Sequence, residues 1–306
     1  MAEHRLETVV GNMTDVFSAE APAALAVDPG DTVVVRCLDA GGYLEPMKTP
    51  GDIRPQMFPK ARGHCLVGPI AVRGARPGMM LAVRLVSLRP DDWGWTVTAL
   101  RNSLLGERLG LADEPGSWLL WDIDADEGTA RNDRGLTVDL APFLGVIGLP
   151  PAEPGEHSTI PPRACGGNID CRELVAGSTL YLPVTVPDAL LCIGDGHGAQ
   201  GDGEVCGTAV ECGMTVELVA DLARDRPIPT AHAETPAGRI TFGFSPDLNE
   251  ASAQALDAML GWMQELFEVD KAAALALASP SVHLRVTQVA NQVWGVHALL
   301  PATALR

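Results

Sequence analysis

The stretch "ALLCIGDGHGAQGDGEVCGTAVECGMTVELVADL", residues 189–222, decides between two kinds of fold. Its first residues form an apolar run typical of a buried strand, and 196–201 then match G-x-G-x-x-G, the spacing of a dinucleotide-binding turn. Such a turn must lead into a helix whose N-terminus meets the phosphates. Here glycines and alternating β-branched residues follow instead, and no Lys-Ser/Thr pair completes a P-loop. We therefore interpret the stretch as two strands joined by a glycine-rich turn.

Strand-like runs continue on both sides of this stretch. Short apolar or alternating runs bounded by Gly, Pro and Asp are typical of strands, and 32 glycines and 24 prolines supply the turns. These runs are 31–38, 79–88, 136–140, 178–186, 189–193, 214–222 and 239–244. The acidic stretch 122–135 indicates an exposed hairpin or loop. The sequence therefore predicts a β-rich body.

The C-terminal part has a different pattern. Ser245 and Asp247 are candidate helix caps, and apolar residues then recur at three- and four-residue steps from Leu248 to Phe267. A second short helix is expected from Asp270, and strand-like alternation returns at 281–301. We therefore expect a compact α/β segment at this end of the chain.

Three segments describe the expected organisation. They are an N-terminal β domain at 1–150, a β core with the site motifs at 151–230, and the α/β segment at 231–306. The proline-rich stretch 148–163 is the candidate linker, because proline denies a strand its ladder hydrogen bonds. An ordered loop lining a site is the alternative interpretation of that stretch.

Charge and cysteine content exclude several partners. The chain has 39 Asp and Glu against 22 Lys and Arg, a net charge of −17, which repels nucleic acid and anionic membrane surfaces. Its apolar runs, such as 272–278, are too short to span a membrane. Seven cysteines without a C-x-x-C pair, and a start without a secretory pattern, predict free thiols in the cytoplasm.

Polar residues spaced by two mark the candidate site. Residues i and i+2 of an extended chain point to the same face, so we expect each pair to converge. The pairs are Asp195 with His197, Asp202 with Glu204, and Asn168 with Asp170. Two carboxylates and an imidazole suit a divalent metal, and crowded carboxylates need a shared cation or proton. A plain Asp-Gly turn is the alternative, although Glu211 adds to the crowding.

A second group lies at 161–174. Cys165 beside Gly166 and Gly167 suggests a nucleophile next to backbone oxyanion donors, with His157 or His197 as its partner. A buried structural thiol is the other interpretation of Cys165. Asn168 either polarises a substrate carbonyl or caps the Gly-Gly turn, and His64 either lines the site or anchors its strand.

Several of these motifs resemble those of the acetamidase/formamidase family. They are "GHCLVGPIAVRGARPG" (63–78), "PGEHSTIPPR" (154–163), "GGNID" (166–170), "GSTLYLPVTV" (177–186) and "GDGHGAQGDGEVCGTAVE" (194–211). The resemblance implies hydrolysis of short linear amides to carboxylate and ammonia. It also implies a mostly β (α+β) fold with barrel- or jelly-roll-like halves, a metal-supported site and a homo-oligomer, a dimer or larger. No nucleic acid or membrane partner is expected.

The resemblance also suggests roles for individual residues. Asp170, Asp195 and His197 are the expected metal ligands, for zinc ahead of calcium. The expected catalytic residues are Glu204 as general base, Asn168 and Glu211, and the expected substrate-binding residues are His64, Gly166 and Gly167. Gly196 and Gly198 stand where the family pattern has bulkier residues, which puts pocket size in question.

Two alternatives stay open. One is a metal-free amidase or lactamase that uses a carboxylate pair or Cys165. The other is a non-catalytic β-sandwich binding protein in which the acidic cluster holds structural calcium.

Overall fold

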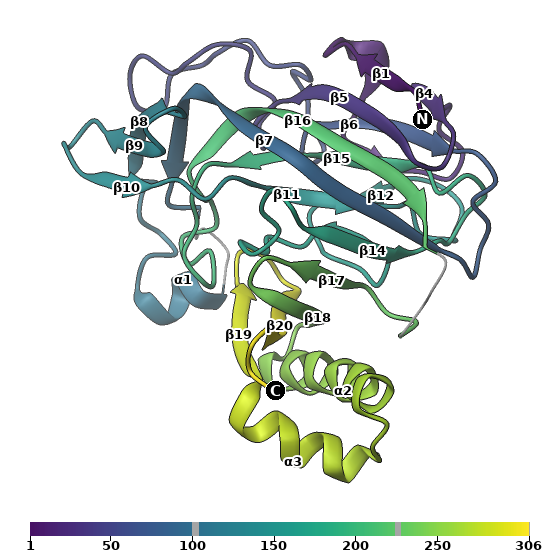
Figure 1. Ribbon diagram of the computed structural model, residues 1–306. Coiled ribbons are helices and arrows are strands. Elements are labelled where there is room, and N and C mark those ends of the chain that lie inside the picture. Colours follow the sequence, from purple (N-terminus) through teal and green to yellow (C-terminus); the bar gives the residue numbers. More distant parts are fainter. Residues whose placement is uncertain (100–103, 224–227, 306) are drawn as a thin grey trace.

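The computed structural model describes residues 1–99, 104–223 and 228–305, and strands dominate it (Figure 1). The expectation of a mostly β fold with a small C-terminal α/β segment is confirmed. The described strands form hydrogen-bonded layers and close no barrel. No helix in the described ranges is long and apolar enough to cross a membrane.

One run of strands forms the front layer in Figure 1 and continues into the C-terminal segment. Its members, in order of pairing, are β1 (Glu3–Leu6), β5 (Asp31–Cys37), β16 (Glu211–Leu222), β7 (Met80–Val97), β14 (Thr179–Pro183), β17 (His232–Thr235), β18 (Gly238–Ser245), β20 (Trp294–Pro301) and β19 (His283–Gln288). A side branch from β7 holds β8 (Trp118–Asp124), β9 (Thr129–Asn132) and β10 (Thr137–Asp139).

A second run forms the layer behind. It consists of β2 (Met13–Thr14) and β4 (Leu25–Val27) on β6 (Leu66–Val72), then β15 (Leu191–His197), β11 (Phe143–Gly148) and β13 (Gly166–Asn168). Both layers contribute to one hydrophobic core, for example Val35 and Leu218 from the front and Ile70 and Leu144 from behind. The layers join where His197 of β15 pairs with Glu211 of β16.

The remaining elements are short. They are η1 (Val10–Asn12), the pair β3 (Val16–Phe17) and β12 (His157–Ser158), and α1 (Leu104–Leu109). Because β12 pairs with β3, the proline-rich stretch is an ordered loop rather than a free linker at that point. The division into three domains stays a prediction; β14 pairs with β7 across the expected boundary at 150.

The C-terminal segment packs two helices on its own strands. α2 (Leu248–Phe267) begins at Asp247, whose carboxylate accepts hydrogen bonds from Asn249 N and Glu250 N, and α3 (Lys271–Ser281) follows. The side chains of Ala251 and Met259 are fully buried against β18 and β20. Phe267, the predicted end of the apolar stripe, is 38% exposed, because the helix ends there.

Two strands differ from their predicted extents. β7 continues to Val97, beyond the predicted end at 88, because its polar second half pairs with β8. β15 extends through the Gly194–His197 motif, and no helix follows it, as the strand–turn–strand interpretation requires. The glycine motif is therefore itself part of a buried strand.

The acidic stretch 122–135 is a hairpin formed by β8 and β9.

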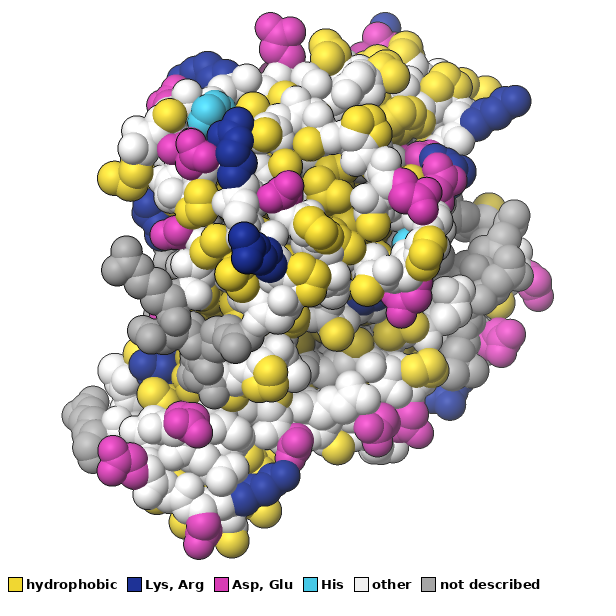
Figure 2. Space-filling view, turned by 90° about the vertical axis from the view of Figure 1, so that its right-hand side faces the viewer, with side chains coloured by type: hydrophobic (Ala, Val, Ile, Leu, Met, Phe, Trp, Pro, Cys, Tyr) yellow, Lys and Arg dark blue, Asp and Glu magenta, His cyan; other side chains and the backbone are white. Residues whose placement is uncertain are grey.

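The surface carries charge of both signs. On the face shown in Figure 2, hydrophobic side chains gather on the strand-built body, whereas acidic side chains are spread over the body and the C-terminal segment. On this face, acidic side chains thus occur on both the body and the C-terminal segment.

Candidate active site

Three charged side chains meet at the junction of the two layers. Asp195 and His197 lie at the end of β15, and Glu211 begins β16 opposite His197. His197 Nε2 is 3.4 Å from Asp195 Oδ1 and 3.3 Å from Glu211 Oε1. All three side chains are almost fully buried. The two side chains of the Asp195–His197 pair thus converge, although Asp195 has a φ of 62° and the chain is not regularly extended there.

Two further carboxylates reach this point from loops. Ligand atoms of Asp170, Asp195 and His197 lie within 4.8 Å of one another, and so do those of His197, Glu204 and Glu211. Asp170 follows β13, and Glu204 lies in the turn between β15 and β16. We call the five residues Asp170, Asp195, His197, Glu204 and Glu211 the site cluster.

Asp202 does not join the site cluster, although its spacing from Glu204 suggested that it would. Residues 201–208 form turns rather than a strand, so the i, i+2 rule does not apply there. Gly203 and Glu204 both have positive φ, of 95° and 45°. Asp202 instead hydrogen-bonds to Arg285.

Burial shapes the electrostatics of the site cluster. It raises the pKa of Glu204 well above the usual range, and the Asp170 carboxylate raises it further. Burial likewise raises the pKa of Asp170, and it brings that of Glu211 to about 7. For Asp195, burial is outweighed by His197 and His64, which hold its pKa below the usual value. The buried carboxylates of the site cluster therefore need a bound cation or shared protons to balance their charge.

Gln200 orients the imidazole. Its amide Nε2 donates to the Asp170 carbonyl oxygen at 2.8 Å, so its Oε1 is left to accept from His197 Nδ1 at 3.0 Å. The Nε2 atom of His197 therefore faces the carboxylates, where only a proton or a cation complements them. Burial opposes charge on His197, but Glu211 and Asp195 raise its pKa well above the usual value. Sequence reasoning missed Gln200, although it stands inside the quoted motif.

Gly145 is a second residue that sequence reasoning missed. A Cβ on Gly145 would lie 2.5 Å from Asp195 Oδ2 and 2.8 Å from Asp170 Oδ1. Its carbonyl oxygen also accepts from Asp170 N at 3.1 Å. Only glycine leaves room for both carboxylates here. A glycine inside an otherwise apolar buried strand was the available signal.

The site cluster has the chemistry of a cation site. Several of its buried atoms have no hydrogen-bond partner: both Asp170 carboxylate oxygens, Asp195 Oδ1, His197 Nε2, Glu204 Oε2 and Glu211 Oε2. Buried carboxylate oxygens without donors are costly unless a cation or protons match them. Oxygen ligands with one imidazole nitrogen fit a divalent metal, so the residues present fit the group that the sequence predicts.

The expected substrate-binding residues surround the cluster unevenly. His64 Nε2 lies 3.8 Å from Asp195 Oδ2, and its backbone N donates to Thr159 Oγ1 at 2.7 Å. Thr159 belongs to the proline-rich stretch, which thus reaches the site. Asn168 is buried, and its Oδ1 has no hydrogen-bond partner.

Gly166 and Gly167 have a packing requirement of their own. They have φ of 91° and 109°, and a Cβ on Gly166 would lie 2.4 Å from Ile147 O. The Gly166 N–H donates to Arg163 O at 3.0 Å, so this donor is already engaged. Close packing on β11 therefore accounts for Gly166 without a role as an oxyanion donor.

Cys165 occupies a core position. It is 4% exposed, its thiol donates to Leu149 O at 3.2 Å, and burial raises its pKa. His157, a candidate partner, hydrogen-bonds to Glu153 O instead. A buried thiol with a raised pKa is a poor nucleophile, so the structural interpretation fits Cys165.

A small cavity adjoins the site cluster. Its volume is about 180 Å³, and Glu204 lines it together with Thr96, Ala199, Gln200, Val205, Thr208 and Ala209, among others. Gly196 lies elsewhere: a Cβ there would sit 2.4 Å from Cys212 O, so this glycine serves close packing. Glycine is therefore needed at position 196 for the strands to pack closely, and it does not enlarge the cavity.

Comparison with known proteins places the chain among its relatives. A sequence model described as "Acetamidase/Formamidase family" matches residues 9–157 and 151–237. The chain belongs to this family. The match includes all five residues of the site cluster.

Individual members of the family show the same similarity. A formamidase of Methylophilus methylotrophus is 27% identical over 273 residues, which cover 70% of this chain and 65% of that protein. An acetamidase of Mycolicibacterium smegmatis is 26% identical over 264 residues, 67% of this chain and 64% of that protein. The chain thus aligns with slightly under two thirds of the length of these two relatives. The crystal structure of an acetamidase from Bacillus halodurans superposes with a TM-score of 0.84 at 26% identity and covers 97% of each chain.

Proposed function

We propose that this chain hydrolyses the C–N bond of short linear amides to carboxylate and ammonia. Family membership supports this reaction, as do the relatives named formamidase and acetamidase. The observation that carries the proposal is the site cluster, with its buried unpartnered oxygens, next to a cavity of about 180 Å³. A cavity of that size suits formamide or acetamide better than a long-chain amide.

Asp170, Asp195 and His197 are the residues that would hold a divalent cation, zinc ahead of calcium. Their ligand atoms lie within 4.8 Å of one another, and one of them is an imidazole nitrogen, which zinc accepts and calcium avoids. When bound, such an ion polarises the amide carbonyl and lowers the pKa of water. Gln200 keeps the His197 Nε2 atom turned toward the cluster.

Glu204 is the proposed general base, because it both lines the cavity and belongs to the site cluster. Burial raises its pKa, and a cation bound at the site would favour the carboxylate form that a base requires. Glu204 takes a proton from the attacking water, whose oxygen bonds to the amide carbon. It then delivers the proton to the nitrogen as the C–N bond breaks, so that a carboxylic acid and ammonia form, and the acid then gives up its proton to become the carboxylate.

The other expected roles rest on position. Glu211 lies on the neighbouring strand with its Oε1 atom 3.3 Å from His197 Nε2, so its carboxylate borders the point where the cation would bind. Asn168 is the proposed donor to the substrate carbonyl, through its amide nitrogen. His64, whose Nε2 lies 3.8 Å from Asp195 Oδ2, and the backbone of Gly167 are the proposed substrate-binding groups. A homo-oligomer and a cytoplasmic location stay predictions.

Ammonia release tests the reaction directly. The purified protein is assayed on formamide, acetamide, longer linear amides and cyclic amides, and its metal content is measured by elemental analysis. We expect turnover of the short linear amides. No turnover on the whole panel, combined with melting that depends on metal, would support a binding protein with structural calcium instead.

Chelation separates the metal-supported enzyme from a metal-free one. We expect that removal of the ion abolishes ammonia release and that zinc restores it. Full activity of the metal-free protein would favour the carboxylate-pair alternative.

A further inference from the structure

Arg285 of β19 joins two loops that it does not itself belong to. Its Nε donates to Asp202 Oδ2 and its Nη2 to Asp202 Oδ1, both at 2.8 Å, and its Nη1 donates to Glu173 Oε1. Asp202 stands two residues before Glu204, and Glu173 stands three residues after Asp170. One guanidinium therefore holds the two loops that carry the loop-borne acids of the site cluster.

Backbone contacts extend this connection. Gly203 N donates to Thr287 O at 3.2 Å, and Val289 N donates to Gly203 O at 2.8 Å. Gly203 lies between Asp202 and Glu204, so the end of β19 contacts the Glu204 turn through both side chain and main chain. The turn is thereby tied to the C-terminal segment rather than to the body alone.

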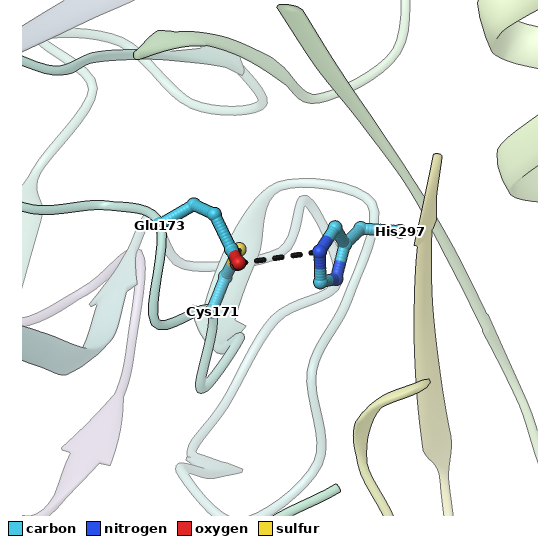
Figure 3. Close-up of side chains that lie close together, drawn as sticks. All are labelled: Cys171, Glu173 and His297. Carbon is cyan, nitrogen blue, oxygen red and sulfur yellow. Dashed lines mark hydrogen bonds and ion pairs between the residues drawn. The ribbon is translucent and has the colours of Figure 1, made fainter. Parts of the chain in front are cut away.

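Glu173 is fixed from the same segment. His297 of β20 lies with its Nε2 3.2 Å from Glu173 Oε2, and the Cys171 thiol donates to the same oxygen at 3.4 Å (Figure 3). Burial opposes the charge of Glu173, but His297 and Arg285 hold its pKa at about 2. We call Cys171, Glu173 and His297 with Arg285 the anchor cluster.

The anchor cluster contains a Cys, a Glu and a His, which are also metal-ligand types. Its carboxylate, however, already accepts from Arg285 on one oxygen and faces Cys171 and His297 with the other. The chain itself therefore supplies the charge that a metal would supply. This balance favours an anchor over a second metal site.

The loops that Arg285 holds carry strained backbone. Asp170 and Glu204 are non-glycine residues with φ of 52° and 45°, in the left-handed region. Such conformations persist only where the surroundings hold them. We propose that Arg285 is a positioning residue, which clamps the Asp170 loop and the Glu204 turn so that both carboxylates face His197.

The clamp gives the C-terminal α/β segment a part in the reaction, although it contributes none of the site cluster. This inference rests on the proposed amide hydrolysis for its kinetic test, but not for its structural one. Arg285→Leu removes the guanidinium, and Arg285→Lys keeps the charge without the two-sided fork. We expect kcat to fall about tenfold to a hundredfold in Arg285→Leu with KM changed much less, and Arg285→Lys to recover part of the loss.

A milder variant guards against loss of folding. Asp202→Asn removes the carboxylate that is 37% exposed and leaves no buried charge without a partner. We expect a smaller fall in kcat than in Arg285→Leu. In the double variant Asp202→Asn with Glu173→Gln, the further change Arg285→Leu should add little, because both partners are already weakened.

Lys271→Ala is the matched control. It breaks an exposed ion pair with Asp257 on the same segment, and we expect kcat and KM to stay at their wild-type values. Equal losses in Lys271→Ala and Arg285→Leu would overturn the clamp, because they would reflect a general weakening of the segment.

Hydrogen exchange gives a readout that does not need activity. We expect amides at 168–174 and 199–207 to exchange faster in Arg285→Leu than in wild type, with no change in Lys271→Ala. Unchanged exchange in both segments would overturn the clamp. A wild-type protein that releases no ammonia, yet shows this exchange pattern, would overturn the proposed function and leave the clamp supported.

Discussion

Two buried acidic clusters among the described residues, the anchor cluster and the site cluster, have opposite electrostatics. In the anchor cluster, Glu173 is matched by Arg285 and His297, and its pKa falls to about 2. In the site cluster, four carboxyl groups share one imidazole, and burial raises the pKa of Asp170, Glu204 and Glu211. Where the chain supplies the counter-charge, buried acids hold structure together. Where it does not, they are left to receive a cation, a proton or a substrate.

The largest effect is expected at Glu204. If it is the general base, Glu204→Gln should lower kcat by on the order of a hundredfold or more, with metal content unchanged. Steady-state kinetics and elemental analysis check both parts. Glu127→Gln, at an exposed turn, is the control and should keep full activity. A Glu204→Gln protein with its metal and its full rate would contradict the assignment.

Gly145 tests whether the site cluster needs its close spacing. In Gly145→Ala the new Cβ would lie 2.5 Å from Asp195 Oδ2, so we expect the carboxylates to shift. We expect kcat/KM to fall at least about tenfold, and the free energy of unfolding to fall by about 1–3 kcal/mol.

Gly11→Ala is the matched control for Gly145→Ala. Gly11 lies in η1, away from the site, and nothing stands within 4 Å of its added Cβ. We expect Gly11→Ala to keep activity and stability. Equal behaviour of the two alanine variants would show that steric room at Gly145 is irrelevant.

The anchor cluster predicts a pH dependence of stability. The pKa of Glu173 is lowered to about 2, so the unfolded chain binds a proton at higher pH than the folded one does. The stabilisation is therefore complete above about pH 5 and is lost as the pH falls toward 2. It is on the order of 2 kcal/mol after allowance for solvent screening.

Denaturant unfolding of wild type and Glu173→Gln between pH 7 and pH 2.5 measures this term. We expect the difference in unfolding free energy to be largest at pH 7 and to shrink as the solution is acidified. A difference that is constant with pH would mean that the Glu173 charge is not the source of the stabilisation.

The smallest effect on activity is expected at Cys165. Its thiol packs in the core and donates to Leu149 O, so Cys165→Ala should keep kcat and lower the free energy of unfolding by about 1 kcal/mol. Ammonia release and thermal unfolding check the two parts. Loss of activity without loss of stability would revive the cysteine nucleophile.

Local patterns predicted most of the fold because they act over a few residues. The run 31–38 corresponds to β5, and the apolar steps after Asp247 correspond to α2 with that residue as its cap. The run 189–193 was recognised as a strand, but β15 spans Leu191–His197, so the Gly194–His197 motif lies in the strand and not in the predicted turn. The i, i+2 rule failed at Asp202, because positive φ at Gly203 and Glu204 turns the chain away from the extended form.

The residues missed at the site belong to distant segments. Gly145 lies on β11, and Arg285 and His297 lie on β19 and β20, far from the motifs in sequence. Nothing local in "HLRVTQ" or "WGVHALLP" marks Arg285 or His297, since their roles depend on what faces them across the fold. Gln200, inside the motif, and Gly145, a glycine in an apolar strand, were within reach of sequence reasoning.

By itself, the sequence determined the family, the mostly β class, the capped C-terminal helix and the four acids and one imidazole that the site motifs offer. These follow from residue order, periodicity and spacing, which act along the chain. Tertiary structure alone decided which carboxylates converge, which one is matched by Arg285, and where a Cβ is forbidden. The physical reason is that burial and counter-charge are properties of packed segments, and loops carry positive φ only where other parts of the molecule hold them.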